Sequence, residues 1–144
     1  MQFFTKAIVK QPGKAYIEAL TSVELGDVDL DRALKQHAAY VRALEQCGLT
    51  VTVLPPDDLP DSVFVEDPAI CVGGATILTR PGAESRLAEV ENIAPTLRGR
   101  FDEVYAIESP GTLDGGDVLE TDKGFYIGVS ARTNMEGIEQ WIRT

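Results

Sequence analysis

The chain has 144 residues with a hydrophobic fraction of 44%, which suits one ordinary domain with a real core. Thirteen basic against 23 acidic residues give a net charge of −10, which argues against nucleic acid and anionic membrane surfaces as partners. The first six residues lack the apolar segment of a signal peptide, and no apolar run could span a bilayer, so we expect a cytoplasmic protein.

The first half of the chain predicts a strand, a helix and a second strand. Residues 3–9 are predicted to form a strand, and residues 49–54 alternate apolar and polar as a second one. Between them, Asp29 or Asp31 could cap a helix running to about Cys47, which Gly48 would end. Residues 55–61 are prolines and acids typical of a loop.

The second half predicts two hairpins, each followed by a helix. The expected elements are a short strand at 63–65, a hairpin of 69–72 with 75–79, a helix at 83–97, a strand at 103–107, a hairpin of 118–121 with 125–129, and a helix capped by Thr133 or Asn134 and reaching 142. Asp67 and Asp117 open the two hairpins 50 residues apart, which indicates an internal repeat of strand, strand, helix, strand. The second repeat stops at Thr144, so we expect either further sequence or a partner chain.

Two adjacent acids, Glu66 and Asp67, stand just before the first hairpin, where their charges repel each other unless a cation binds. No spacing for a calcium site is present, and two cysteines with a single histidine do not predict zinc, so we expect no metal and no cofactor. A planar guanidinium is the cation that paired carboxylates bind best. The alternative is that these loop acids are solvated or cap turns.

A second acidic segment, Asp114-Gly115-Gly116-Asp117, precedes the second hairpin. The glycines allow a close backbone approach or a positive φ, although a tight turn explains them equally well. Asp117 could be purely structural, accepting N–H groups of the glycine turn.

The remaining candidate side chains are expected either to bind a carboxylate or to have a structural role. Arg80, Arg86 and Arg132 could bind a carboxylate, but each could also form a surface ion pair. Phe125, Tyr126 and Trp141 are expected in the core, His37 is read as packed, and Cys71 is read as buried. No pair of nucleophile and base is recognisable.

Four ordered motifs together resemble the dimethylarginine dimethylaminohydrolases. They are LPDSVFVEDPAIC, TRPGAESR, SPGTLDGGDVL and FYIGVSARTNMEG, and the likeness spans nearly the whole chain. This family belongs to the guanidino-group-modifying, or pentein, superfamily with arginine deiminase and the amidinotransferases. The resemblance implies an α/β propeller of five strand–strand–helix–strand units, of which residues 1–144 would be a single N-terminal portion, about half the ring.

The family reaction hydrolyses N-methylated arginine to citrulline and methylamine or dimethylamine, with a cysteine nucleophile and a histidine. The resemblance implies that Asp114 orients that histidine and neutralises the guanidinium as its carbon becomes tetrahedral. The implied substrate-binding residues are Leu20 in a lid, Glu66 and Asp67 facing the guanidinium, Asp61 in the same binding region, and Arg86 and Arg132 at the α-carboxylate.

The family's histidine and cysteine lie in its C-terminal half, and His37 and Cys71 stand at the wrong motif positions to replace them. We therefore expect this chain alone to be inactive, with a small guanidino compound as ligand and a complementing C-terminal half or a second copy as a possible partner. Two alternatives stay open. One is a non-catalytic guanidino-binding or partner-dependent module, and the other is an arginine deiminase or amidinotransferase.

Overall fold

The computed structural model describes residues 4–21, 23 and 26–144, and these form an α/β fold. The chain divides into two compact units, residues 1–65 and residues 66–144. In the part of the chain that the structure describes, no helix combines the length and apolar character that a membrane crossing needs.

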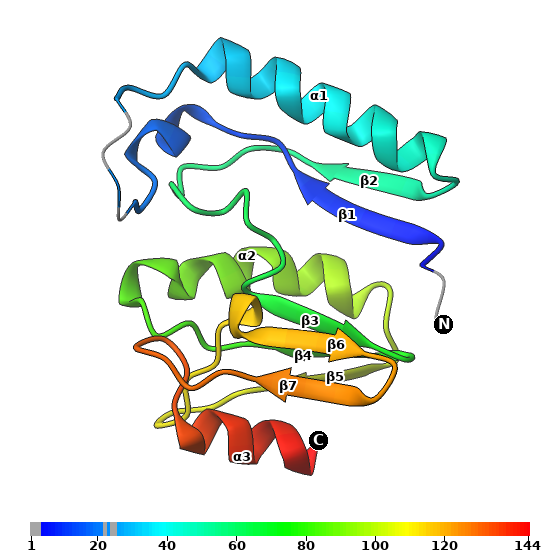
Figure 1. Cartoon of the computed structure of the whole chain (residues 1–144), viewed down its shortest axis with the longest axis vertical. Helices are drawn as coiled ribbons and strands as arrows, with labels where there is room; N and C mark the ends of the chain where they lie inside the picture. Colours follow the sequence, from blue (N-terminus) through cyan, green and yellow to red (C-terminus); the bar gives the residue numbers. More distant parts are fainter. Residues whose placement is uncertain (1–3, 22, 24–25) are drawn as a thin grey trace. The chain divides into compact units, whose positions relative to one another are not determined.

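The first unit is a strand–helix–strand arrangement (Figure 1). Strands β1 (Lys6–Lys10) and β2 (Thr50–Leu54) pair in parallel, and the 3₁₀-helix η1 (Lys14–Glu18) and the helix α1 (Leu30–Gln46) connect them. The side chain of Asp29 caps α1 by accepting a hydrogen bond from the Arg32 N–H at 3.0 Å. Gly48 follows the helix with φ = 86°, a conformation that favours glycine. The predicted cap and stop of this helix are confirmed.

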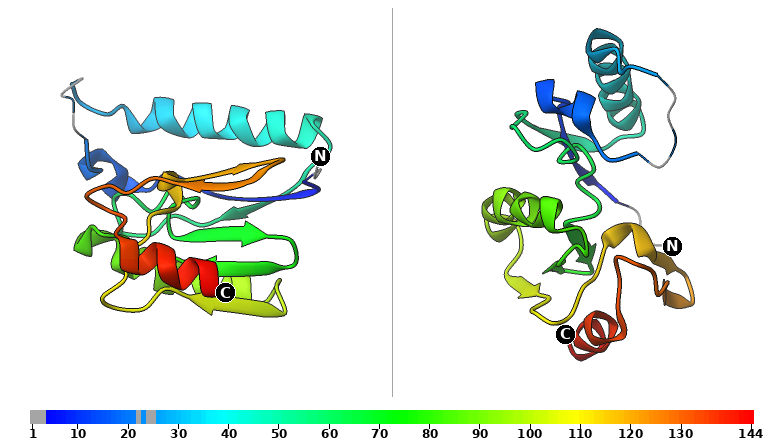
Figure 2. Two further views of the ribbon diagram at one scale, coloured as in Figure 1. Left: turned by 60° about the horizontal axis from the view of Figure 1, so that its bottom comes forward. Right: turned by 90° about the vertical axis from the view of Figure 1, so that its left-hand side faces the viewer.

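The second unit begins with a three-stranded sheet. Strands β3 (Ala69–Val72) and β4 (Ala75–Leu78) form the predicted antiparallel hairpin, and β5 (Glu103–Ala106) pairs in parallel with β4. Between β4 and β5 lie the 3₁₀-helix η2 (Glu84–Arg86) and the helix α2 (Leu87–Arg98), which buries Ile93, Ala94 and Leu97. Figure 2 shows α2 on one side of this sheet and the following hairpin and helix on the other.

That following segment repeats the first. The 3₁₀-helix η3 (Gly115–Asp117) leads into the antiparallel strands β6 (Val118–Thr121) and β7 (Gly124–Ile127), and the helix α3 (Met135–Arg143) comes next. Asn134 caps α3 through its side-chain oxygen, which accepts from the Gly137 N–H at 2.8 Å. The core here is Ile77, Ile107 and Leu113, with Ile70, Val118, Ile127, Ile138 and Trp141 packed against it.

Some details of the predicted elements and burial differ in the structure. The segment 63–65 is not a strand but part of a turn, because the Phe64 N–H donates to the Asp61 carbonyl at 3.0 Å instead of to a neighbouring strand. The helix expected from residue 83 begins as η2 and becomes α-helical only at Leu87. Tyr126 is 58% exposed, because it alternates with Phe125, whose ring meets that of Trp141 edge to face at 5.4 Å.

Candidate functional site

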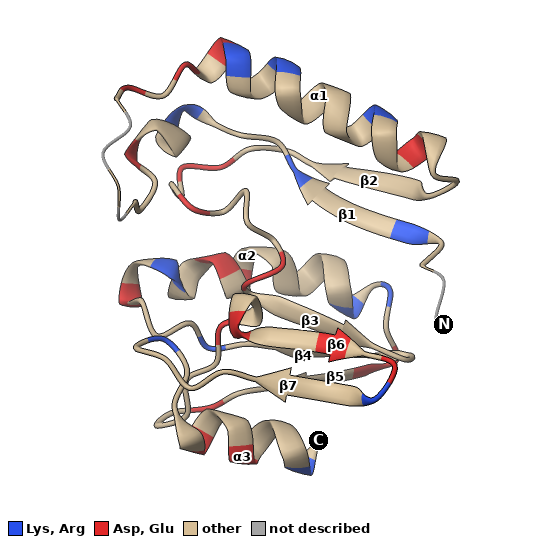
Figure 3. Ribbon diagram, viewed as in Figure 1, with Lys and Arg blue, Asp and Glu red and all other residues tan. Residues whose placement is uncertain are grey.

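Acidic residues follow one another along the segment between β2 and β3 (Figure 3). At the end of this segment, the Glu66–Asp67 backbone lies directly on Gly115 and Gly116. The Gly115 N–H donates to the Asp67 carbonyl at 3.0 Å, and a Cβ on Gly115 would overlap the Glu66 carbonyl oxygen. A Cβ on Gly116 would lie 2.9 Å from Asp67 Oδ1. Gly115 is therefore needed for the close backbone approach, whereas a Cβ on Gly116 would displace only the Asp67 side chain; neither glycine has a positive φ.

Thr79, at the end of β4, holds Asp67 from the other side. Its hydroxyl donates to the Asp67 carbonyl at 2.7 Å, and its N–H donates to the Pro68 carbonyl at 3.0 Å. Thr79 was not predicted as a site residue. The signal for it is the hairpin register, because Leu78 pairs with Ala69 and the next residue must face the start of β3.

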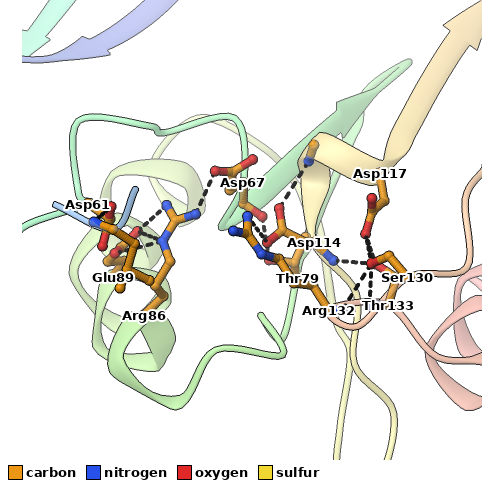
Figure 4. Close-up of polar contacts among 12 residues, drawn as sticks. Asp61, Asp67, Thr79, Arg86, Glu89, Asp114, Asp117, Ser130, Arg132 and Thr133 are labelled. Carbon is orange, nitrogen blue, oxygen red and sulfur yellow. Dashed lines mark hydrogen bonds and ion pairs between the residues drawn. The ribbon is translucent and has the colours of Figure 1, made fainter. Parts of the chain in front are cut away.

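Arg86 lies at the junction of η2 and α2, where it is held between two carboxylates (Figure 4). Its Nη1 donates to Asp67 Oδ2 at 2.6 Å, its Nη2 to Glu89 Oε2 at 2.7 Å, and its Nε to both Glu89 oxygens at 3.0 and 3.2 Å. The side chains of Arg86 and Glu89 are only 4% and 3% exposed. Burial opposes the charge of Arg86, but the hydrogen bonds that Arg86 donates to Glu89 and to Asp67 outweigh it and raise the pKa of the guanidinium. Sequence reasoning missed Glu89, although its spacing of three residues from Arg86 places both on one helix face.

Asp114 is a buried acid of this unit. Its Oδ1 caps η3 by accepting from the Gly116 N–H at 3.2 Å, and the residue is only 2% exposed. Its buried Oδ2 has no hydrogen-bond partner among the described residues. Burial, followed by the negative charge of Asp67, raises the pKa of Asp114 to about 6. A carboxyl with such a pKa can gain or lose a proton near neutral pH.

Arg132 approaches the same carboxyl from the loop between β7 and α3. Its Nη1 lies 3.8 Å from Asp114 Oδ2, a distance too long for a hydrogen bond, and its side chain is 54% exposed. The backbone of Arg132 packs against Gly82, where a Cβ would come within 2.6 Å of the Arg132 Cα. The structure thus brings Asp67, Asp114 and Arg132 to one edge of the second unit and leaves the Arg132 guanidinium accessible.

The other predicted site residues are Glu66, Leu20 and Asp61. Glu66 has an exposed side chain, and its backbone carbonyl is the part that meets the glycine turn. Leu20 and Asp61 belong to the first unit, where the Leu20 N–H donates to Asp61 Oδ1 at 2.9 Å. Asp61 is 6% exposed and Leu20 is 57% exposed. The bond joins Leu20 to Asp61, and the expected substrate-binding roles of both residues stay predictions.

Two structural assignments made from the sequence need correction. Asp117 does not bind the glycine turn, because its Oδ2 accepts from the Ser130 and Thr133 hydroxyls, both at 2.6 Å. Cys71 is exposed rather than buried, because β3 is an edge strand of its sheet. No cluster of three His, Cys, Asp or Glu side chains suited to a metal ion is found within residues 4–21, 23 and 26–144.

The chain is similar to known proteins over nearly its whole length. The model of the family "N,N dimethylarginine dimethylhydrolase, eukaryotic" matches residues 18–144. The dimethylarginine dimethylaminohydrolase of Pseudomonas aeruginosa is 48% identical over 141 residues, which is 96% of this chain and 56% of that protein. The enzyme of the same name from Streptomyces coelicolor is 44% identical over 137 residues, covering 94% of this chain and 53% of that protein.

A solved structure shows the same fold. A cysteine-to-serine mutant of the P. aeruginosa enzyme, complexed with citrulline, superposes with a TM-score of 0.94 and 48% identity, covering 98% of this chain and 56% of that one. The chain spans about half the length of the relatives it matches. On the family match and these identities, the chain belongs to the dimethylarginine dimethylaminohydrolase family.

Proposed function

We propose that this chain carries the guanidinium-binding acids of an active site that hydrolyses N-methylated arginine to citrulline and methylamine or dimethylamine. The observation that carries the proposal is the buried Asp114 carboxyl, whose Oδ2 lacks a hydrogen-bond partner among the described residues and which lies beside Asp67. Membership of the dimethylarginine dimethylaminohydrolase family supports the same reaction class.

The charges around Asp114 favour a cationic ligand. Three carboxylates lie buried or half-buried in the second unit: Asp67, Glu89 and Asp114. The buried Arg86 forms ion pairs with Asp67 and Glu89. Arg132 is mostly exposed and stands 3.8 Å from Asp114. A buried carboxylate without full compensation is costly, so a planar cation that reached Asp114 would be bound favourably.

Within this proposal each residue has the role that the family resemblance implies. Asp67 and Glu66 bind the guanidinium, with Asp61 and Leu20 taking part in substrate binding and covering. Asp114 orients a histidine and neutralises the guanidinium during attack. The exposed Arg132 is well suited to bind the α-carboxylate, whereas Arg86 would have to share a guanidinium that Asp67 and Glu89 already bind.

The nucleophilic cysteine and the histidine of this chemistry would come from outside residues 1–144. We propose that the repeated order β3–β4–α2–β5 and β6–β7–α3 represents successive units of a five-unit propeller, which a C-terminal half or a second copy would complete. The sheets described here contain two, three and two strands and are not closed into a ring. On this view the 144-residue chain binds substrate but does not turn it over.

Calorimetric titration of the chain with asymmetric dimethylarginine tests the binding part. Asp67→Asn should weaken binding tenfold or more, because one partner of a desolvated ion pair is lost, a cost on the order of 2–5 kcal/mol. Asp102→Asn, an exposed acid of the same unit, is the matched control and should leave the affinity unchanged. Equal affinities for wild type and Asp67→Asn would remove Asp67 from the guanidinium site.

A colourimetric assay for citrulline tests the chemical part. The chain alone should form none from asymmetric dimethylarginine or from arginine. Citrulline formation that disappears in a Cys71→Ser variant would contradict the predicted inactivity and would identify a nucleophile in this chain. Tighter binding of arginine than of asymmetric dimethylarginine would favour the arginine deiminase alternative.

A further inference from the structure

Asp117 lies beside the proposed site, and the mechanism above does not use it. One oxygen of its side chain, Oδ2, accepts two short hydrogen bonds at 2.6 Å, from Ser130 Oγ and from Thr133 Oγ1 (Figure 4). Hydroxyl-to-carboxylate bonds of this length are charge-assisted and strong. Asp117 therefore fixes both hydroxyls in one orientation, with their hydrogens directed at the carboxylate.

Each hydroxyl then accepts a backbone N–H that belongs to a proposed site residue. Thr133 Oγ1 accepts from the Asp114 N–H at 3.0 Å, and Ser130 Oγ accepts from the Arg132 N–H at 2.9 Å. A hydroxyl has one hydrogen and two lone pairs, so donation to Asp117 leaves the lone pairs free for these amides. Two branches thus lead from one carboxylate, one to Asp114 and the other to Arg132.

The surroundings leave this network little room to move. Thr133 is 0% exposed and Asp114 is 2% exposed, so water cannot replace the Thr133 hydroxyl as an acceptor for the Asp114 N–H. On the Arg132 branch, a Cβ on Gly82 would come within 2.7 Å of the Arg132 carbonyl oxygen, so the loop is also confined by backbone. The backbones of Asp114 and Arg132 are consequently tied to one network, whereas the Arg132 side chain, 54% exposed, extends from it.

We propose that Asp117 is a positioning residue that sets the relative placement of Asp114 and Arg132 through the hydroxyls of Thr133 and Ser130. If the proposed function is correct, Asp114 meets the guanidinium end of the ligand and Arg132 meets its α-carboxylate, so the network selects ligands in which these two groups have the right spacing. A ligand with only a guanidinium does not depend on that spacing. The consequence is a specificity effect and not only a stability effect.

Hydrogen exchange of the 144-residue chain, followed by NMR, tests the positioning independently of any ligand. Thr133→Val removes only the Asp114 branch and should accelerate exchange of the Asp114 amide about tenfold or more, whereas Thr133→Ser keeps the hydroxyl and should stay near wild type. The Ile77 amide in β4 is the internal reference. Equal acceleration at Ile77 would show a general loss of stability and would overturn the positioning role.

Calorimetry with two probes tests the specificity. Asp117→Ala removes both branches, and Ser130→Ala removes the Arg132 branch together with the bond that Ser130 Oγ accepts from the Thr133 N–H at 3.2 Å. Each variant should weaken the binding of asymmetric dimethylarginine about tenfold or more and the binding of methylguanidine only slightly. Equal losses for both probes would overturn the specificity role. If the wild-type chain bound neither probe, the proposed function would fail for this chain, and exchange of the Asp114 amide in Asp117→Ala would still decide whether Asp117 positions Asp114: acceleration as in Thr133→Val supports the role, and wild-type exchange would overturn it.

Discussion

Replacing Asp114 by asparagine should stabilise the chain at neutral pH while it removes a proposed catalytic group. Asp114 is buried beside Asp67, and its Oδ2 has no hydrogen-bond partner among the described residues, so its ionisation is unfavourable in the folded state. Asparagine has the same shape without the charge, and its amide N–H can donate to the Asp67 carboxylate. Groups that cost stability and are retained are often functional.

The magnitude follows from the pKa of Asp114, which burial and Asp67 raise from 3.8 to about 6. Between these values the folded state binds more protons than the unfolded state, so the free energy of unfolding falls as the pH rises. The full shift corresponds to about 3 kcal/mol, and about 1 kcal/mol of it falls between about pH 5 and about pH 8. The Asp114→Asn variant has no titrating group at this position. Its free energy of unfolding should therefore not show the decrease with rising pH that Asp114 causes in the wild type.

Urea unfolding followed by the fluorescence of Trp141 measures this effect, because Trp141 is the single tryptophan and lies in the same unit as Asp114. The free-energy difference between Asp114→Asn and wild type should grow by about 1 kcal/mol from about pH 5 to about pH 8. Asp122→Asn removes an exposed carboxylate in the β6–β7 turn and should show no such growth. A difference for Asp114→Asn that did not change with pH would refute the reasoning.

Glu89→Ala leaves the buried Arg86 without its main partner. Urea unfolding should show a free energy of unfolding lower by about 3–5 kcal/mol. A loss as small as that of an exposed ion pair would contradict the pairing. Gly115→Ala forces a Cβ onto the Glu66 carbonyl and should cost about 1–3 kcal/mol, whereas an unchanged unfolding midpoint would place the two loops farther apart. Arg132→Ala should weaken the binding of asymmetric dimethylarginine in calorimetry and leave the binding of methylguanidine unchanged. Equal losses of affinity for both ligands would show that Arg132 does not bind the α-carboxylate.

Local signals predicted most of the fold. The caps Asp29 and Asn134 and the stop at Gly48 each act within a few residues of their own position, so the helix ends were predictable. Both hairpins were predicted because short apolar runs flank glycine turns. Residues 63–65 were not, since the turn bonds to Leu59 and Asp61 outweigh a short alternating pattern.

The site was predictable only in part. Motif resemblance named Asp67, Asp114 and Arg132 as candidates, and the structure brings these three residues together in the second unit. It did not identify Glu89 or Thr133, because their roles depend on a buried side-chain pair and on a bond between residues 19 positions apart. Such partners become visible only when the loops are placed in space.

The most direct test of the central claim is a carboxyl-carbon NMR titration of Asp67 and Asp114 with and without asymmetric dimethylarginine. A bound guanidinium places a positive charge beside both carboxylates, which favours their charged forms. We predict that the ligand shifts both signals and lowers the pKa of Asp114 from about 6. Signals and titration curves that the ligand leaves unchanged would contradict the claim that these acids bind a guanidinium.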